Sequence, residues 1–182
     1  MELSPEQRLQ QWREQERALR AKLVEAGVAP RSELAAHSGA DFLRAILRGE
    51  LPRVPIGETL NFLPVEVEPG RVVFQGTPQP AFFNPIGSIH GGWAATLLDS
   101  CMGCAVHSML PPGRGYTTLE LKVNFVRALL PEVGPVRAEG RVVHVGGRVG
   151  TAEGRIVDAA GKLYAHGSTT CLIFDLPTDG TP

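Results

Sequence analysis

The pattern of apolar and polar positions predicts a helical arm over the first fifty residues. Ser4-Pro5-Glu6-Gln7 is typical of a helix start, because serine caps, proline suits the first turn and glutamine completes a capping box. Gly27 is the expected end of this helix, and Ser38–Asp41 and Gly49 are the expected limits of a second one. The first helix carries an apolar stripe at helical spacing, formed by Leu9, Trp12, Leu19 and Leu23. We expect this arm to pack over a sheet or a partner subunit.

From Leu60 the pattern changes to that of strands around one apolar helix. Leu60–Glu68 and Arg71–Thr77 are predicted strands, separated by a Pro-Gly turn. Pro78–Ser88 contains three prolines and is expected to be irregular. The segment that follows, Ile89–Leu110, is almost entirely apolar, which predicts a buried helix covered nearly all round.

The last part of the chain predicts longer strands joined by short turns. The four strands are Tyr116–Phe125, Val136–Val145, Val149–Val157 and Leu163–Phe174. In the first of these, apolar and polar residues alternate, which predicts two faces. One face would carry Leu119, Leu121, Val123 and Phe125, and the other Thr118, Glu120, Lys122 and Asn124. Long strands with short connections indicate an antiparallel sheet, and curling it around the apolar helix would bury both.

These elements predict an α+β protein in three parts. Residues 1–50 form the helical arm, residues 51–176 form the sheet-and-helix domain, and residues 177–182 form a flexible tail. The length of 182 residues, with 43% hydrophobic and 20% charged residues, suits one globular domain with such an arm.

Charge and cysteine content narrow the class of protein. The formal net charge of −1 gives no overall field that would attract nucleic acid. No apolar run approaches the roughly 20 residues that span a bilayer, and the charged start lacks a signal-peptide core. Three cysteines do not suggest a disulfide framework, and Cys101 and Cys104 are expected to be core residues and not metal ligands. We therefore expect a cytoplasmic protein with neither a nucleic-acid nor a membrane partner, and no metal.

The start of the apolar helix is the first candidate site. The stretch Asn84–Gly92 ends in Gly91 and Gly92, whose missing side chains let a ligand approach the backbone. Free N–H groups and the positive end of the helix dipole there suit a carbonyl oxygen that gains negative charge, as in an oxyanion hole. The alternative is that the two glycines only permit close packing of the helix on the sheet.

Asp99 is the second candidate, because it is a carboxylate inside an apolar helix, where an unpartnered charge is costly. The alternative is a structural or interface pair. His90 and Asp99 are nine residues apart, which corresponds to about 13 Å of rise and to opposite sides of the helix. If both serve one site, the site must combine two subunits related by a two-fold axis, with two equivalent sites in each dimer.

These residues carry a family resemblance. The sequence NPIGSIHGGWAATLLDS, followed by GRGYTTLELKVNFVRALLP, resembles the phenylacetate-pathway (PaaI-like) type of hotdog-fold thioesterase. The resemblance extends from about Leu51 to Phe174, and its specific part is Asn84–Asp99. It implies an antiparallel sheet wrapped around the central helix, homodimers or homotetramers, and hydrolysis of acyl- or aryl-CoA thioesters. It implies no cofactor other than the coenzyme A of the substrate.

The resemblance also implies roles for single residues. The carboxylate of Asp99 would activate water or attack directly, and the backbone N–H of Gly91 would polarise the thioester carbonyl. Asn84 and His90 would help to position the thioester, and the hydroxyl of Thr118 would help to hold the water. The resemblance does not distinguish a base from a nucleophile at Asp99.

Further candidates concern substrate binding. Arg127 and the hairpin tip at Gly147 and Arg148 could hold the phosphates of CoA, as basic groups and turn N–H groups do elsewhere. Gly92 could lie against the substrate beside Gly91. The acyl group could contact Trp93 or the Phe82-Phe83 pair, although aromatic residues pack ordinary cores equally well.

Two other functions remain open at this point. One is a hotdog hydratase or dehydratase, which would change a double bond and release no thiol. The other is a non-catalytic acyl-CoA-binding protein. The sequence leaves the acyl group, the choice between dimer and tetramer, and the role of the arm undetermined.

Overall fold

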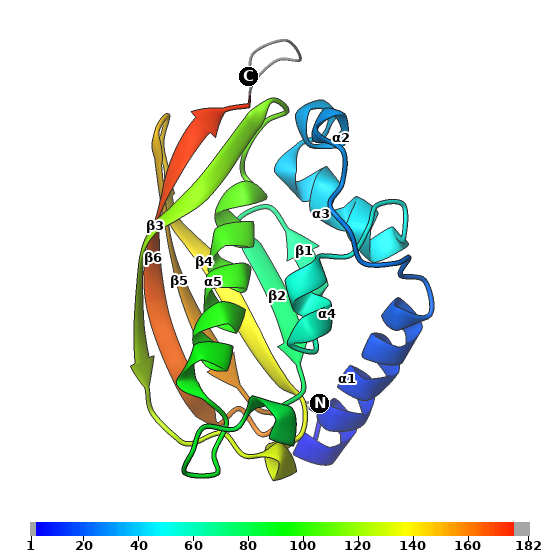
Figure 1. Cartoon of the computed structure of the whole chain (residues 1–182), viewed down its shortest axis with the longest axis vertical. Helices are drawn as coiled ribbons and strands as arrows, with labels where there is room; N and C mark the ends of the chain where they lie inside the picture. Colours follow the sequence, from blue (N-terminus) through cyan, green and yellow to red (C-terminus); the bar gives the residue numbers. More distant parts are fainter. Residues whose placement is uncertain (1–2, 177–182) are drawn as a thin grey trace.

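The computed structural model describes residues 3–176 and contains one six-stranded antiparallel sheet, in the order β1-β2-β4-β5-β6-β3. The sheet curves around a single long helix, α5, so that the helix lies in its concave face (Figure 1). The strands are β1 (Phe62–Glu68), β2 (Arg71–Gly76), β3 (Arg114–Phe125), β4 (Val136–Val145), β5 (Val149–Val157) and β6 (Leu163–Asp175). The α+β class and the hotdog arrangement expected from the sequence are confirmed.

Helix α5 (Gly91–His107) forms the centre of the core and contacts every strand. Leu97, Leu98 and Met102 on this helix are completely buried. Close approach of helix and sheet depends on Gly140 of β4, because a Cβ there would lie 2.3 Å from the carbonyl oxygen of Cys101. The sheet therefore curves around the apolar helix as the sequence predicts.

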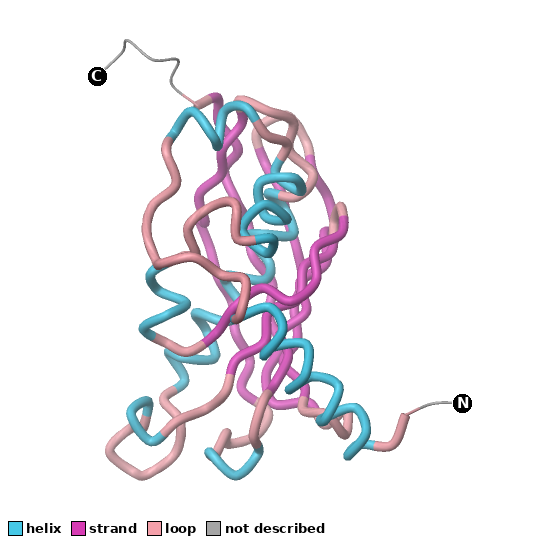
Figure 2. Tube along the Cα trace, turned by 90° about the vertical axis from the view of Figure 1, so that its right-hand side faces the viewer, coloured by secondary structure: helices cyan, strands magenta, loops and turns pink. Residues whose placement is uncertain are grey.

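The arm contains α1 (Pro5–Arg20), α2 (Arg31–Ala36), α3 (Gly39–Arg48) and α4 (Pro55–Thr59). Helix α1 crosses obliquely over the outer face of β1 and β2 (Figure 2). It is fixed there by Gln75, which is completely buried and donates to the carbonyl oxygen of Trp12 at 3.2 Å and to Glu16 at 2.7 Å. Arg137 stacks on the ring of Trp12, 4.5 Å from its centroid. This part of the arm covers the protein's own sheet.

Helix α3, in the second part of the arm, lies against the C-terminal end of α5. The backbone N–H of Gly39, the first residue of α3, donates to the carbonyl oxygen of Leu110 at 3.0 Å. A Cβ at Gly39 would overlap the carbonyl oxygen of His107, so the start of α3 touches the end of α5 directly. These contacts fix α3 relative to the central helix.

The expected helix limits are partly wrong in the arm. The Ser4 capping box and the Gly49 end of α3 are present, with Gly49 at a φ of 76°. However, α1 ends at Arg20 and not at Gly27, because the following residues run extended and Ala26 pairs with Arg53. The short helices α2 and α4 were not expected. The predicted tail at 177–182 lies outside the described residues.

The alternation expected for β3 is wrong at Thr118 and at Leu119, which is 61% exposed, and this matters for the site. The pairing of β3 with β6 shifts its register between Thr118 and Glu120, as a β-bulge does. Because of the extra residue, Thr118 faces α5, and so do Leu121 and Val123 further along the strand. Simple alternation had put Thr118 on the opposite face.

Candidate active site

Asp99 and Thr118 form the centre of the candidate site. The hydroxyl of Thr118 donates a hydrogen bond of 2.9 Å to Oδ1 of Asp99. Asp99 is half-buried on α5, and Thr118 reaches it because the bulge in β3 turns the side chain toward the helix. The carboxylate therefore has one polar partner, and its other oxygen, Oδ2, accepts no hydrogen bond from the described residues.

A cavity of about 440 Å³ opens beside this carboxylate. Its floor is one face of α5, with Ser100, Cys104 and His107, and Tyr116 of β3 lies against it. Its opposite wall belongs to the arm. Burial raises the pKa of the Cys104 thiol to about 12 and raises that of the Tyr116 hydroxyl well above its usual value. Both groups are therefore neutral, and Asp99 is the one carboxylate that lines this cavity.

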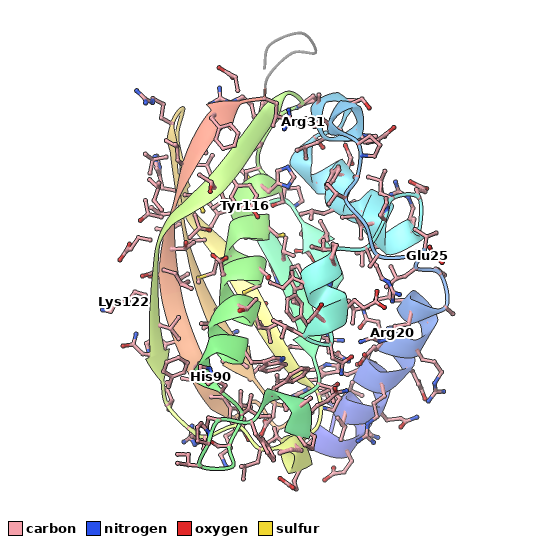
Figure 3. The ribbon with its side chains drawn as sticks, viewed as in Figure 1. Arg20, Glu25, Arg31, His90, Tyr116 and Lys122 are labelled. Atoms are coloured by element: carbon pink, nitrogen blue, oxygen red, sulfur yellow. The ribbon has the colours of Figure 1, made fainter. Side chains whose placement is uncertain are left out.

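The start of α5 lies at the other end of the helix. His90 is the N-cap, and its Nδ1 accepts a hydrogen bond of 2.8 Å from the N–H of Gly92. Figure 3 shows His90 at this end and Tyr116 beside the half that follows Asp99. The N–H of Gly91 donates to no acceptor within residues 3–176. A Cβ at Gly91 would lie 3.0 Å from the ring of Phe125, and a second cavity of about 350 Å³ is lined by Gly91, Phe125 and Arg127.

Asn84 holds the loop before this helix in place. Its Oδ1 accepts from the backbone N–H groups of Ile86 and Ser88, each at 3.1 Å, and its Nδ2 donates to the Ser88 hydroxyl at 2.8 Å. All of these contacts are within the loop. In this chain Asn84 is thus a positioning residue for the approach to Gly91.

Within one chain, Gly91 and Asp99 are well separated. They are eight residues apart on α5, which corresponds to about 12 Å of rise. The two residues line different cavities. A carbonyl group that accepts from Gly91 cannot also be within reach of Asp99 of the same chain.

The predicted phosphate-binding residues are also separated. Arg127 donates to the carbonyl oxygen of Leu163 at the start of β6, whereas the carbonyl of Arg148 accepts from the N–H of Ile173 near its end. Ten residues of strand correspond to about 33 Å. Arg127 and the Gly147–Arg148 hairpin tip therefore cannot hold one phosphate group within a single chain.

His107 and Tyr116 line the cavity beside Asp99 but were not among the predicted site residues. Their rings lie 5.4 Å apart, and Phe42 of α3 lies 5.8 Å from His107 on the other side. Spacing on α5 could have indicated His107, since it follows Asp99 by eight residues and so lies on the same face. Trp93, in contrast, does not line this cavity; it stacks on Phe82 and donates to the carbonyl oxygen of Leu60.

Burial of His107 predicts a dependence of stability on pH. Desolvation lowers its pKa from 6.5 to about 4, so the unfolded chain binds a proton that the folded chain does not between these values. Stability should therefore fall as the pH falls from 6.5 to 4, by about 3 kcal/mol from this group. Urea unfolding at pH 7 and pH 4 should show a smaller loss for His107→Gln than for the wild type. The exposed His166 provides the control His166→Gln, and an equal loss in both variants would contradict the assignment.

The described chain contains neither a metal site nor a membrane span. Within residues 3–176, no group of three or more His, Cys, Asp or Glu side chains is arranged to hold a metal ion. Among the same residues, no helix has the length and apolar character needed to cross a bilayer.

Comparison with known proteins finds a likeness to a family of thioesterases. The sequence pattern of the thioesterase superfamily matches residues 86–165, which contain the start of α5, Asp99 and Thr118. This match covers 80 of the 182 residues, which is less than half of the chain.

Three relatives show how far the likeness extends. A candidate esterase of Halobacterium salinarum is 42% identical over 82 residues, which are 44% of this chain and 52% of the relative, so the match spans about half the length of that protein. The 1,4-dihydroxy-2-naphthoyl-CoA hydrolase of Listeria monocytogenes is 26% identical over 116 residues, 64% of this chain and 93% of the enzyme. The crystal structure of a candidate thioesterase related to phenylacetic acid degradation, from Ralstonia eutropha, superposes with a TM-score of 0.66 at 29% identity, over 71% of this chain and 98% of that chain.

Proposed function

We propose that this protein hydrolyses acyl-CoA thioesters to a free acid and coenzyme A, with Asp99 as the base or nucleophile. The observation that carries the proposal is the Asp99 carboxylate, which accepts from Thr118 and lines a mostly apolar cavity, within the part of the chain that matches the thioesterase-superfamily pattern. The name of the Listeria relative supports a CoA thioester as the substrate. We place the enzyme in the cytoplasm.

The reaction needs a polarised carbonyl, a positioned water and a base. With Asp99 as base, the carboxylate takes a proton from water while the water oxygen bonds to the thioester carbon. The carbon–sulfur bond then breaks, and the CoA thiolate leaves and takes up the proton. With Asp99 as nucleophile, the carboxylate oxygen bonds to the thioester carbon, and the carbon–sulfur bond breaks to release the CoA thiolate. Water then hydrolyses the resulting anhydride and regenerates Asp99.

We propose that a second copy of the chain completes the site. The thioester carbonyl would accept from Gly91 of one subunit and lie beside Asp99 of the other, since the two residues of one chain are about 12 Å apart. Strand β3 is an edge strand of the sheet and carries the exposed apolar side chains of Leu119 and Phe125, and exposed Val126 follows directly after it. Antiparallel pairing of two β3 strands would cover this edge and form a homodimer.

The same pairing would bring the separated phosphate-binding residues together. Antiparallel strands reverse direction, so the end of one subunit that carries Arg127 would lie toward the end of the partner that carries Gly147 and Arg148. The phosphates of one CoA could then be held from both subunits. This arrangement is compatible with a dimer and equally with a tetramer built from two such dimers.

Thr118 provides a graded test of the site. Thr118→Val removes the hydroxyl that donates to Asp99 and should lower kcat/KM by about tenfold to a hundredfold, the effect of losing one hydrogen bond to a charged group. Thr118→Ser keeps a hydroxyl and should retain most of the activity. Equal activity in both variants, measured by thiol release, would remove Thr118 from the site.

Thiol release from a panel of acyl- and aryl-CoA thioesters tests the function itself. We expect release from at least one of them by the wild type and almost none by Asp99→Asn. A change in double bonds without thiol release would indicate a hydratase instead.

A further inference from the structure

We propose that the arm segment 28–56 forms the specificity wall of the acyl pocket, so that the enzyme prefers an unbranched, apolar, medium-length acyl chain lying along α5 from Asp99 toward His107. This inference rests on the proposed function. It assigns a role to the part of the chain that lies outside the region matched by the family pattern, residues 86–165.

The cavity beside Asp99 owes its outer wall to the arm. The apolar residues that the arm contributes include Val28, Leu34, Phe42, Val54 and Ile56. Val28, Val54 and Ile56 are exposed to 89%, 47% and 46% and line the same cavity, and exposed apolar side chains that gather in one place mark ligand-binding grooves. A bound acyl chain would cover these side chains and so accounts for their position at the rim.

The floor of the cavity follows α5 over about two turns, and this stretch from Asp99 to His107 is called the channel here. Asp99, Ser100, Cys104 and His107 lie on one face of α5, at the spacing of successive helical turns. From Asp99 to His107 the helix rises about 12 Å, which exceeds the width of a single aromatic ring. An acyl chain whose carbonyl lies at Asp99 would therefore extend along α5 between the helix and the arm.

The polar groups along this channel do not favour a charged acyl group. His107 is neutral because burial lowers its pKa to about 4, and Ser100 donates to the carbonyl oxygen of Thr96. Arg31 is the one basic residue in the lining, and it lies exposed at the rim, at the start of α2 (Figure 3). The remaining lining is mostly aliphatic and aromatic, and a volume of about 440 Å³ is within the usual range for a small-molecule site.

The wall is held in place and needs no large movement to receive the chain. Gly39 at the start of α3 touches the carbonyl of His107, and the N–H of Gly27 donates to the carbonyl oxygen of Arg53 at 3.0 Å. The two arm segments on either side of the cavity are thus tied to α5 and to each other. A fixed wall can discriminate between acyl groups by length.

The experiment measures kcat/KM by thiol release for acetyl-, butyryl-, hexanoyl-, octanoyl- and decanoyl-CoA, and for benzoyl- and adipoyl-CoA. For the wild type we expect an increase of about fourfold per buried methylene until the channel is full, followed by a decline. The double variant Val28→Asn with Ile56→Asn makes the wall polar and should lower the octanoyl-CoA value by about tenfold relative to acetyl-CoA. Val54→Trp should shift the preference toward shorter chains.

Matched controls use exposed valines outside the cavity. Val24→Asn on the arm and Val143→Asn on β4, exposed to 43% and 62%, should leave the length profile unchanged. The inference is overturned if the wall variants keep the wild-type profile, if benzoyl- or adipoyl-CoA is preferred over octanoyl-CoA, or if the wall variants change only the oligomeric state in sedimentation. The absence of thiol release from every thioester would instead remove the proposed function. Calorimetry with octyl-CoA, a non-hydrolysable thioether, and the Asp99→Asn variant measures how tightly the acyl chain binds to the wall in the absence of turnover.

Discussion

Asp99→Asn should lower kcat/KM for thioester hydrolysis by about 10³-fold or more, in the upper range of what a general base contributes and with a larger effect if Asp99 is the nucleophile. The amide has the size of the carboxylate but can neither take a proton from water nor attack a carbonyl carbon. It can still accept the hydrogen bond from the Thr118 hydroxyl, so the local structure should be kept. The rate of thiol release from one acyl-CoA substrate measures this change in kcat/KM.

Folding and binding must be shown to persist in this variant. Thermal unfolding and CoA binding should match the wild type, because the substitution changes no volume in the core. Glu153→Gln is a matched control, since Glu153 is an exposed carboxylate on β5 that forms none of the described ion pairs. Turnover by Asp99→Asn within a few-fold of the wild type would exclude the hydrolytic mechanism and favour a role in acyl-CoA binding.

Gly91→Pro should lower kcat by about 10² to 10³-fold, the usual effect of losing one oxyanion-hole donor. Proline removes the N–H of Gly91, which has no other acceptor in the described chain, and leaves the helix intact because Gly91 is its first residue. His90, with φ −58° and ψ 134°, already has a backbone conformation that suits a following proline. Gly91→Ala keeps the N–H and adds a Cβ that meets only the ring of Phe125 at 3.0 Å, so it serves as the control.

A mixture of two inactive variants tests the two-subunit site directly. In a heterodimer of Gly91→Pro and Asp99→Asn subunits, one site would contain both substitutions and the other would contain neither. Random pairing should therefore restore about a quarter of the wild-type activity after the mixture is unfolded and refolded together. Activity that stays at the level of the separate variants would mean that each site is built within one chain, or that Gly91 does not take part.

Several features could be predicted from the sequence because they depend on residues that are close together along the chain. The Ser4 capping box and the β4 and β5 limits follow from local hydrogen bonding and alternation, and the limits of these two strands agree with the structure to the residue. The central helix was predicted from its length and apolar content, and the antiparallel sheet around it from the short turns between long strands. Asp99 was singled out because a carboxylate is costly among the apolar residues that flank it in the sequence. This contrast is also a local property.

The register of β3 and the construction of the cavity were decided by the tertiary structure. A bulge is fixed by the partner strand, so alternation alone put Thr118 on the wrong face, whereas pairing with β6 turns it toward Asp99. The wall opposite α5 comes from residues 28–56, which precede the start of α5 by at least 35 positions (91 − 56) and reach it through contacts such as that of Gly39 with His107. Local patterns fix elements because their hydrogen bonds are local, but which elements meet around a carboxylate depends on the packing of the whole chain.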